Sequence, residues 1–199
     1  KMKCCGLKWV GGFAENYKLN YPNITGVLIF NDIKTGIPLA IMDCSYLTAI
    51  RTAAVSAIAA ELCAVKNPKT FSVIGCGSQG AMHLQFITAL FPSLTKVRVK
   101  PVVRKSVTDF LKGARQYFNG EIEISATFYE CVSGSDIICT CTNGDYRIIR
   151  KHWLKDGGFS IGIEGGCAYY PAALHSADKF IVDDIPLAEY YEQSTKNRR

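Results

Sequence analysis

The stretch FSVIGCGSQGAMHL, residues 71–84, constrains the fold of this chain more than any other. A short apolar run ends at three glycines, Gly75, Gly77 and Gly80, and continues as a helix-like segment. The G-x-G-x-x-G spacing between a strand and a helix is typical of a dinucleotide-binding turn, in which main-chain N–H groups at the helix start face the pyrophosphate. The first glycine permits the tight turn, the second lets the main chain approach the pyrophosphate, and the third lets helix and strand pack closely. A βα turn without a ligand remains the alternative.

Strand-like and helix-like runs alternate from residue 70 onward, which indicates a parallel sheet with crossover helices. The sequence predicts strands near 70–75, 96–100, 121–125, 136–141, 158–163 and 179–183, and helices near 79–91, 106–118, 128–134, 171–176 and 186–193. We therefore expect an α/β fold, a Rossmann-like doubly wound parallel sheet.

The part that precedes residue 70 has a different pattern. Apolar runs at 24–31 and 37–43, separated by the turn residues of DIKTG, predict an antiparallel hairpin. The alanine-rich segment 45–64 predicts a long helix with Ser45 as its N-cap. Because two strands are too few for a stable domain and the sequence starts with Lys, we expect an incomplete chain.

Composition narrows the classes of function. The hydrophobic share of 48% suits a globular protein, and the N-terminus lacks the pattern of a secretory signal, so we expect a cytoplasmic protein without membrane contact. The net charge of +6 comes without a basic stripe interleaved with aromatics, so we expect no nucleic-acid partner. Nine cysteines, an odd number, indicate reduced thiols, and their spacing relative to the three histidines predicts no metal site.

The segment KVRVKPVVRKS bears on the choice of cofactor. A dinucleotide site usually has an acidic residue at the end of the second strand, where it bonds the ribose hydroxyls. This chain has Lys100 there, with Arg104 and Lys105 nearby. These cations could meet a 2′-phosphate, which favours NADP over NAD, or they could form a solvated face; both cofactors remain open.

Arg51 is a charged residue within an alanine-rich helix. A guanidinium that is buried there would need an anion, such as a bound carboxylate or phosphate. The alternative is an arginine that reaches solvent or a structural carboxylate such as Asp43. Lys8, beside a tryptophan and glycines, would by itself be read as a surface residue.

Four segments occur in one order: GLKWVGGFAENY, NITGVLIFND, SYLTAIRTAAVSAIAA and VIGCGSQG. Together they resemble the ornithine cyclodeaminase/mu-crystallin family over nearly the whole chain, and the segment around Arg51-Thr52 is the most specific of them. The resemblance implies a homodimeric NAD(P)-binding enzyme and a chain that is truncated at both ends relative to the family. Residues 1–64 would be part of an antiparallel substrate and dimerisation domain with its connecting helix, 65–193 the NAD(P)-binding Rossmann domain, and 194–199 a tail.

The resemblance also assigns roles to residues. It implies that Lys8 is the substrate lysine, that Arg51 binds the substrate carboxylate beside the cofactor phosphates, and that Glu164 is the acid/base. The implied cofactor contacts are Thr25, Arg51, Thr52, Ser78, Gln79 and Thr142, in addition to Gly75, Gly77, Gly80 and Lys100, which the glycine turn and the second strand predict.

The expected function is that of an NAD(P)-dependent oxidoreductase acting on the C–N bond of a small amino or imino acid. Cyclodeaminases carry aspartate at the position of Glu164 and often lysine at that of Ala168, so ornithine cyclisation itself is in doubt. The alternatives are a binding protein of mu-crystallin type that holds NADP and a small ligand, ornithine cyclodeaminase proper, and a truncated, inactive product.

Overall fold

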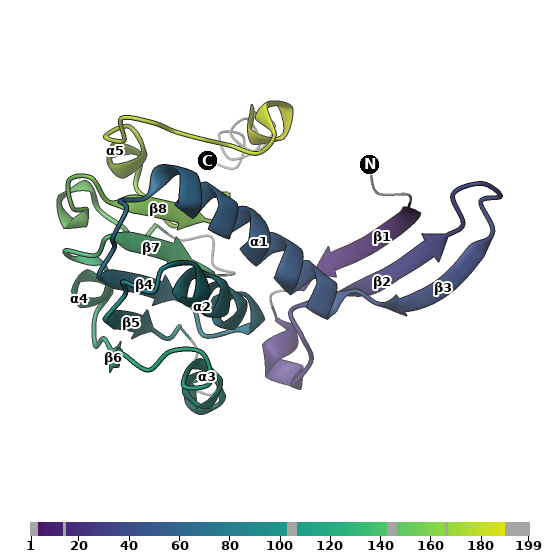
Figure 1. The fold of residues 1–199 in the computed structure, drawn as a ribbon, viewed down its shortest axis with the longest axis horizontal. Coiled ribbons are helices and arrows are strands. Elements are labelled where there is room, and N and C mark those ends of the chain that lie inside the picture. Colours follow the sequence, from purple (N-terminus) through teal and green to yellow (C-terminus); the bar gives the residue numbers. More distant parts are fainter. Residues whose placement is uncertain (1–3, 14, 103–106, 143–146, 166, 190–199) are drawn as a thin grey trace. The chain divides into compact units, whose positions relative to one another are not determined.

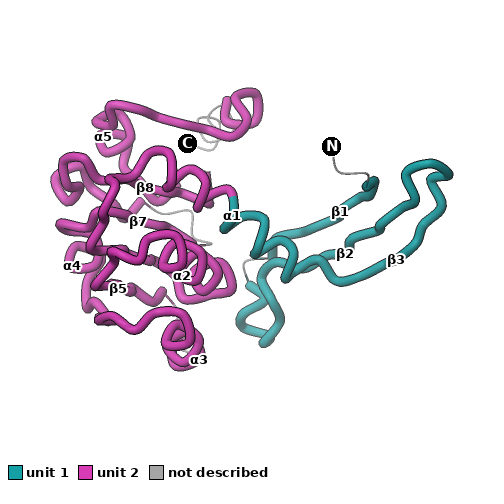
Figure 2. Tube along the Cα trace, in the orientation of Figure 1, with its two compact units in different colours: residues 1–54 teal, residues 55–199 magenta. Residues whose placement is uncertain are grey.

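The computed structural model describes residues 4–13, 15–102, 107–142, 147–165 and 167–189. The chain divides into two compact units, residues 1–54 and 55–199 (Figure 2).

The first unit is built on a three-stranded antiparallel sheet in the order β1-β2-β3 (Figure 1). Its strands are β1 (Cys5–Gly12), β2 (Ile24–Asn31) and β3 (Pro38–Asp43), and a short 3-10 helix, η1 (Asn16–Leu19), follows β1. The predicted β2–β3 hairpin is confirmed. Strand β1 was not predicted, because glycines and a lysine interrupt its apolar pattern. It pairs with β2 along its whole length, from Cys5 opposite Asn31 to Gly12 opposite Ile24.

Helix α1 (Ser45–Cys63) follows β3. The prediction that Ser45 is the N-cap is wrong, because Ser45 already lies in the first turn and its N–H donates to Asp43 Oδ1 at 2.8 Å. The carbonyl of Cys44 accepts the first helical bond, from Thr48 N at 2.8 Å. The C-terminal part of the helix contributes Ala60 to the core of the second unit. The boundary between the units therefore falls inside α1, before the residue 64 expected from the sequence.

Among the described helices, α1 alone is long and apolar enough to cross a membrane by length and composition. A core helix of a globular protein meets the same criterion. Ala49, Ala53, Ser56 and Ala60 are buried at helical spacing, so one face of α1 packs against the protein itself, whereas Val55, Ile58 and Leu62 are exposed.

The second unit is a five-stranded, wholly parallel sheet in the order β6-β5-β4-β7-β8. Its strands are β4 (Thr70–Ile74), β5 (Lys96–Lys100), β6 (Glu121–Ile124), β7 (Ile137–Thr140) and β8 (Phe159–Gly162). Its helices are α2 (Ser78–Leu90), α3 (Val107–Ala114), α4 (Phe128–Val132), η3 (Lys151–Trp153) and α5 (Pro171–Leu174), and residues 185–189 are also helical.

This strand order confirms the predicted doubly wound sheet. From the central β4 the chain moves outward through β5 and β6, then returns to add β7 and β8 on the other side. The order reverses beside β4, and in such sheets ligands bind outside the carboxyl ends of the strands at that point. The expected strand at 179–183 is wrong: residues 179–182 form no ladder, and Phe180 and Ile181 are exposed. An apolar run with high β propensity forms a strand only where a neighbouring strand can pair with it.

Apolar layers cover both faces of the sheet. Phe71 and Val73 of β4 pack in one cluster with Leu84 of α2 and Phe110 of α3. Ile74, on the opposite face, belongs to a second cluster around α4. Because β4 is buried on both faces, its end is a rigid support for the turn that follows.

Candidate active site

The glycine turn joins β4 to α2, and two of its glycines are required by the fold. Gly75 has φ of 105°, and a Cβ there would lie 2.4 Å from the carbonyl oxygen of Cys141. A Cβ on Gly80 would lie 2.0 Å from the carbonyl oxygen of Gly75. The main chains of β4, α2 and the segment after β7 therefore meet here without room for any side chain.

Gly77 differs from the other two glycines. It is the N-cap of α2 with φ of −82°, a conformation open to any residue, and a Cβ there would meet no protein atom within 4 Å. The first N–H groups of a helix have no acceptor within it, and at α2 no N-cap side chain accepts from them. The turn therefore presents main-chain donors and an open space, which is what an anion at a helix N-terminus requires.

Two predicted cofactor contacts have buried polar atoms without a hydrogen-bond partner in the described structure. They are Gln79 Oε1, in the first turn of α2, and Thr142 Oγ1, in the segment after β7. A buried polar atom without a partner is costly, so such atoms commonly mark the place of a ligand or an ordered water. Ser78, the first residue of α2, is exposed and leaves its side of the turn accessible.

Lys100 lies at the carboxyl end of β5, next to the glycine turn, because its carbonyl accepts the N–H of Gly75 at 3.0 Å. Its Nζ donates to the carbonyl of Ala126 at 2.6 Å. A pocket of about 590 Å³ lies beside it, lined by Lys100, Pro101, Val102, Val107, Ile124, Ser125 and Ala126. The hydroxyl of Ser125 is buried there without a partner among the described residues. Arg104 and Lys105, the other predicted cations, lie outside the described residues.

Glu164 follows β8 at the same edge of the sheet, where Gly165 turns the chain with φ of 72°. Thr140, at the end of β7, donates its hydroxyl to Glu164 Oε1, whereas Oε2 is buried without a partner in the described structure. Burial raises the pKa of Glu164 to about 7, although hydrogen bonds from Thr140 and from main-chain N–H groups lower it. A carboxyl group with this pKa can both donate and accept a proton near neutral pH.

The other predicted residues belong to the first unit. Lys8 is half-buried on β1, and its Nζ donates to Thr48 Oγ1 at 3.3 Å. Thr52 donates its hydroxyl to the carbonyl of Thr48 at 2.8 Å, and Thr25 is exposed on β2. Arg51 is exposed, so the expectation that burial would force it to hold an anion does not apply. Its role in binding a substrate carboxylate remains a prediction, as do the roles of Lys8, Thr25 and Thr52.

Sequence reasoning missed Thr140. Thr140 orients the carboxyl group of Glu164, and Tyr169 is buried close enough to Glu164 for that charge to affect the tyrosine's pKa, which burial raises. Topology held a signal for Thr140, because the ends of neighbouring parallel strands meet at one edge of the sheet.

Proteins of known function are similar to this chain in sequence. The profile of the ornithine cyclodeaminase/mu-crystallin family matches residues 1–188. The chain belongs to this family. It is 35% identical over 182 residues to N-((2S)-2-amino-2-carboxyethyl)-L-glutamate dehydrogenase of Staphylococcus aureus, covering 90% of this chain and 54% of that protein. It is 30% identical over 192 residues to the alanine dehydrogenase of Archaeoglobus fulgidus, covering 95% and 58%. The chain thus spans somewhat more than half the length of these relatives.

Solved structures of related proteins have the same fold as this chain. Δ1-pyrroline-2-carboxylate reductase of Thermococcus litoralis, in complex with NADH and L-proline, superposes with a TM-score of 0.79 at 27% identity, over 86% of this chain and 54% of that one. An archaeal alanine dehydrogenase dimer with bound NAD gives a TM-score of 0.79 at 26% identity, over 100% and 63%. The α/β, Rossmann-like fold with a smaller antiparallel sheet is therefore confirmed.

The raised pKa of Glu164 predicts a pH dependence of stability. In the unfolded chain the carboxyl group ionises near 4.5, and in the folded chain near 7. Folding therefore retains a proton between these values, so the free energy of unfolding falls as pH rises from about 4.5 to about 7 and then levels off. Glu164→Gln removes this dependence. From pH 5 to pH 8 the free energy of unfolding of the unsubstituted chain should fall by at least about 1 kcal/mol more than that of the variant, since one pKa unit is worth about 1.4 kcal/mol.

Urea denaturation of the full chain at both pH values measures this difference. Glu189→Gln, at an exposed carboxyl group, is the matched control and should leave the pH dependence unchanged. If the stability of the Glu164→Gln variant and of the unsubstituted chain depended on pH in the same way, the raised pKa of Glu164 would be contradicted.

Proposed function

We propose that this chain binds NAD or NADP and serves as an oxidoreductase that acts on the C–N bond of a small amino or imino acid. One observation supports cofactor binding most directly. The fold requires glycine at positions 75 and 80, whereas nothing in the described structure requires it at 77. A turn without a ligand accounts for the first two glycines but not for the third.

Other features of the second unit support a dinucleotide. The free N–H groups at the start of α2 suit its pyrophosphate, and Gln79 Oε1 and Thr142 Oγ1 offer buried polar atoms at the same edge of the sheet. The pocket beyond β5 and β6, with the Ser125 hydroxyl, suits the adenosine end. Lys100 already bonds a main-chain carbonyl, so the structure does not favour NADP over NAD.

Glu164 would supply the proton chemistry. The bound nicotinamide supplies or accepts the hydride, and reduction of an imine also requires a proton for the nitrogen. Glu164 is partly protonated near pH 7, and Thr140 holds one oxygen of its carboxyl group while the other is left unpaired. Lys8 and Arg51 are proposed as substrate ligands on the family relationship, for the substrate nitrogen and the carboxylate respectively.

The substrate class rests on the relatives. Their names give alanine, pyrroline-2-carboxylate and an amino-carboxyethyl glutamate, and another is an ornithine cyclodeaminase from Agrobacterium fabrum at 30% identity. All of these are small amino or imino acids. Whether this chain produces a net redox change or a redox-neutral cyclisation depends on the substrate that it accepts.

Gly77→Ala tests cofactor binding without disturbing the fold. The added methyl group meets no protein atom, so the variant should fold normally, with at most a small loss at the N-cap. It should weaken NADH binding at least about tenfold, or about 1.4 kcal/mol, because the methyl group occupies the space of the pyrophosphate. Fluorescence titration with NADH and NADPH measures this. Gly113→Ala in α3, where a Cβ also meets nothing, is the matched control. Unchanged binding in the Gly77→Ala variant would contradict the proposed site.

Turnover is tested with reduced nicotinamide and Δ1-pyrroline-2-carboxylate, by following loss of the nicotinamide absorbance. We expect reduction by the full chain, and Glu164→Gln should lower kcat at least about 100-fold with NADH affinity unchanged, because a general acid contributes about 10²–10⁴-fold. Intact NADH binding without any imine reduction would replace this proposal with a binding protein of mu-crystallin type. Conversion of ornithine to proline without a net change in NADH would indicate a cyclodeaminase.

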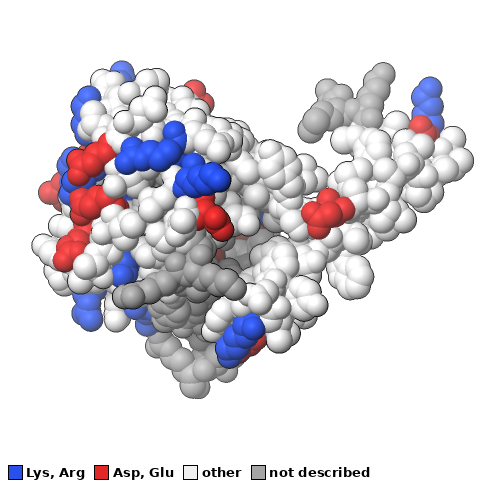
Figure 3. Space-filling view, turned by 90° about the horizontal axis from the view of Figure 1, so that it is seen from below, with Lys and Arg blue, Asp and Glu red and all other residues white. Residues whose placement is uncertain are grey.

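We also propose that the chain forms a homodimer through the first unit. Leu7, Ile29 and Ile41 are opposite one another on adjacent strands and so share one face of the sheet. Leu7 and Ile41 are 62% and 71% exposed, and Figure 3 shows that this part of the chain is largely uncharged on the face in view. An exposed apolar face of this kind is typical of an interface, and the archaeal alanine dehydrogenase neighbour is a dimer.

Ile41→Lys should therefore convert the dimer to a monomer at micromolar concentration, because a lysine would be desolvated at the centre of the interface. Sedimentation velocity on the full chain measures this change. Tyr117→Lys, which places a charge on an exposed aromatic of the second unit, should remain dimeric. A monomeric unsubstituted chain would refute the proposal.

A further inference from the structure

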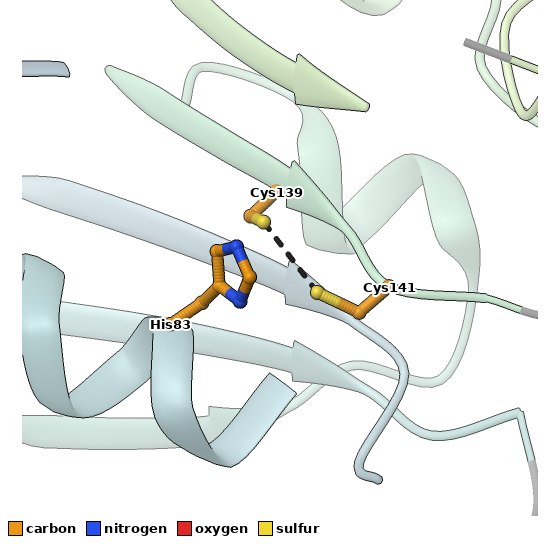
Figure 4. Close-up of side chains that lie close together, drawn as sticks. All are labelled: His83, Cys139 and Cys141. Atoms are coloured by element: carbon orange, nitrogen blue, oxygen red, sulfur yellow. Dashed lines mark hydrogen bonds between the residues drawn. The ribbon is translucent and has the colours of Figure 1, made fainter. Parts of the chain in front are cut away.

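Three side chains of the second unit that could bind a metal ion lie close together, one on α2 and two at the end of β7 (Figure 4). They are His83 in α2, Cys139 in β7 and Cys141 just beyond that strand. Their ligand atoms all lie within 4.8 Å of one another, and the two Sγ atoms are 3.5 Å apart. The sequence spacing predicted no metal site, because His83 is far from both cysteines along the chain. None of the three residues has a part in the proposed hydride chemistry.

The separation of the sulfur atoms suits a shared metal ion. Two thiolates bound to tetrahedral zinc, each at about 2.3 Å, lie about 3.8 Å from each other. The observed 3.5 Å differs from this by only a few tenths of an ångström. The two cysteines are two residues apart at the end of a strand, so their side chains extend from the same face of the sheet.

The hydrogen bonds of His83 decide which ring nitrogen could act as a ligand. Its Nδ1 is 2.7 Å from the carbonyl oxygen of Gln79, which can only accept, so Nδ1 carries the proton. The lone pair is then on Nε2, which accepts from Ser56 Oγ at 2.8 Å. A ring N–H held by a main-chain carbonyl is the usual outer partner of a metal-binding histidine. A metal ion at Nε2 would replace the Ser56 hydroxyl as the partner of this nitrogen.

We propose that His83, Cys139 and Cys141 form a binding site for a thiophilic divalent ion, Zn²⁺, with solvent as the fourth ligand. Binding releases the two thiol protons to solvent and forms two Zn–S bonds and one Zn–N bond. The two thiolate charges balance the charge of the ion, so the complex is neutral and can be accommodated among buried groups. His83 and Cys139 are fully buried, whereas Cys141 is half-exposed and provides the route of entry.

Zinc titration of the full chain tests this proposal. The chain also has exposed cysteines, so Cys4, Cys5 and Cys63 are first replaced by serine to leave the buried and half-exposed thiols. Zn²⁺ is added to the reduced protein in competition with a chromogenic chelator, and Co²⁺ serves as a spectroscopic probe. We expect one ion per chain, two protons released per ion, and a thiolate-to-cobalt charge-transfer band.

Substitutions identify the ligands. Cys141→Ser, at the half-exposed ligand, should weaken Zn²⁺ binding at least about tenfold and abolish half of the proton release. Cys139→Ser should do the same, and His83→Gln should weaken binding and change the cobalt spectrum. Cys167→Ser, at another half-exposed cysteine of this unit, is the control and should bind Zn²⁺ normally. Circular dichroism confirms folding of each variant. Absence of Zn²⁺ binding, or binding unaffected in a folded Cys141→Ser variant, would overturn the proposal.

Discussion

The contact between main chains at the glycine turn is the constraint on which the rest of the second unit depends. Gly80 of α2 approaches the carbonyl of Gly75 so closely that any side chain is excluded, and Gly75 approaches the carbonyl of Cys141 in the same way. These contacts fix where α2 starts relative to β4 and β7. They bring the helix N-terminus, Thr142 and the end of β5 to one edge of the sheet, and this gives the edge its capacity to hold an anionic ligand.

The proposed chemistry follows from the same edge. Parallel strands all end there, so Glu164 after β8 meets Thr140 at the end of β7, and burial between them keeps the carboxyl group partly protonated near neutral pH. Neither feature would suffice by itself: the glycine turn has no acid or base, and Glu164 cannot bind the anionic part of a cofactor. The shared direction of the strands places the glycine turn and the buried carboxyl group at one edge of the sheet. The cluster of His83, Cys139 and Cys141 arises in the same way, because α2 packs beside the end of β7.

Much of the fold could be predicted from the sequence. The positions of β4 to β8, the long helix α1 and the doubly wound order follow from local patterns, apolar runs bounded by turn residues and a G-x-G-x-x-G spacing. The failures have a common cause. Strand β1 has a weak apolar pattern and forms because β2 pairs with it, whereas residues 179–182 have a strong pattern and form no strand because none pairs with them. Arg51 looked buried within an alanine-rich helix, but helical periodicity leaves it on an exposed face.

The sequence by itself determined the glycine turn, since the φ requirement at Gly75 and the strand–turn–helix order are local properties of a few consecutive residues. It also determined membership of the family, because four segments recur in one order. Only the tertiary structure decided that Gly77 is free of protein contacts, that Glu164 is buried beside Thr140, and that His83 meets two cysteines. The reason is that burial, pKa and ligand geometry depend on side chains far apart in sequence, and strand order alone sets which of them become neighbours.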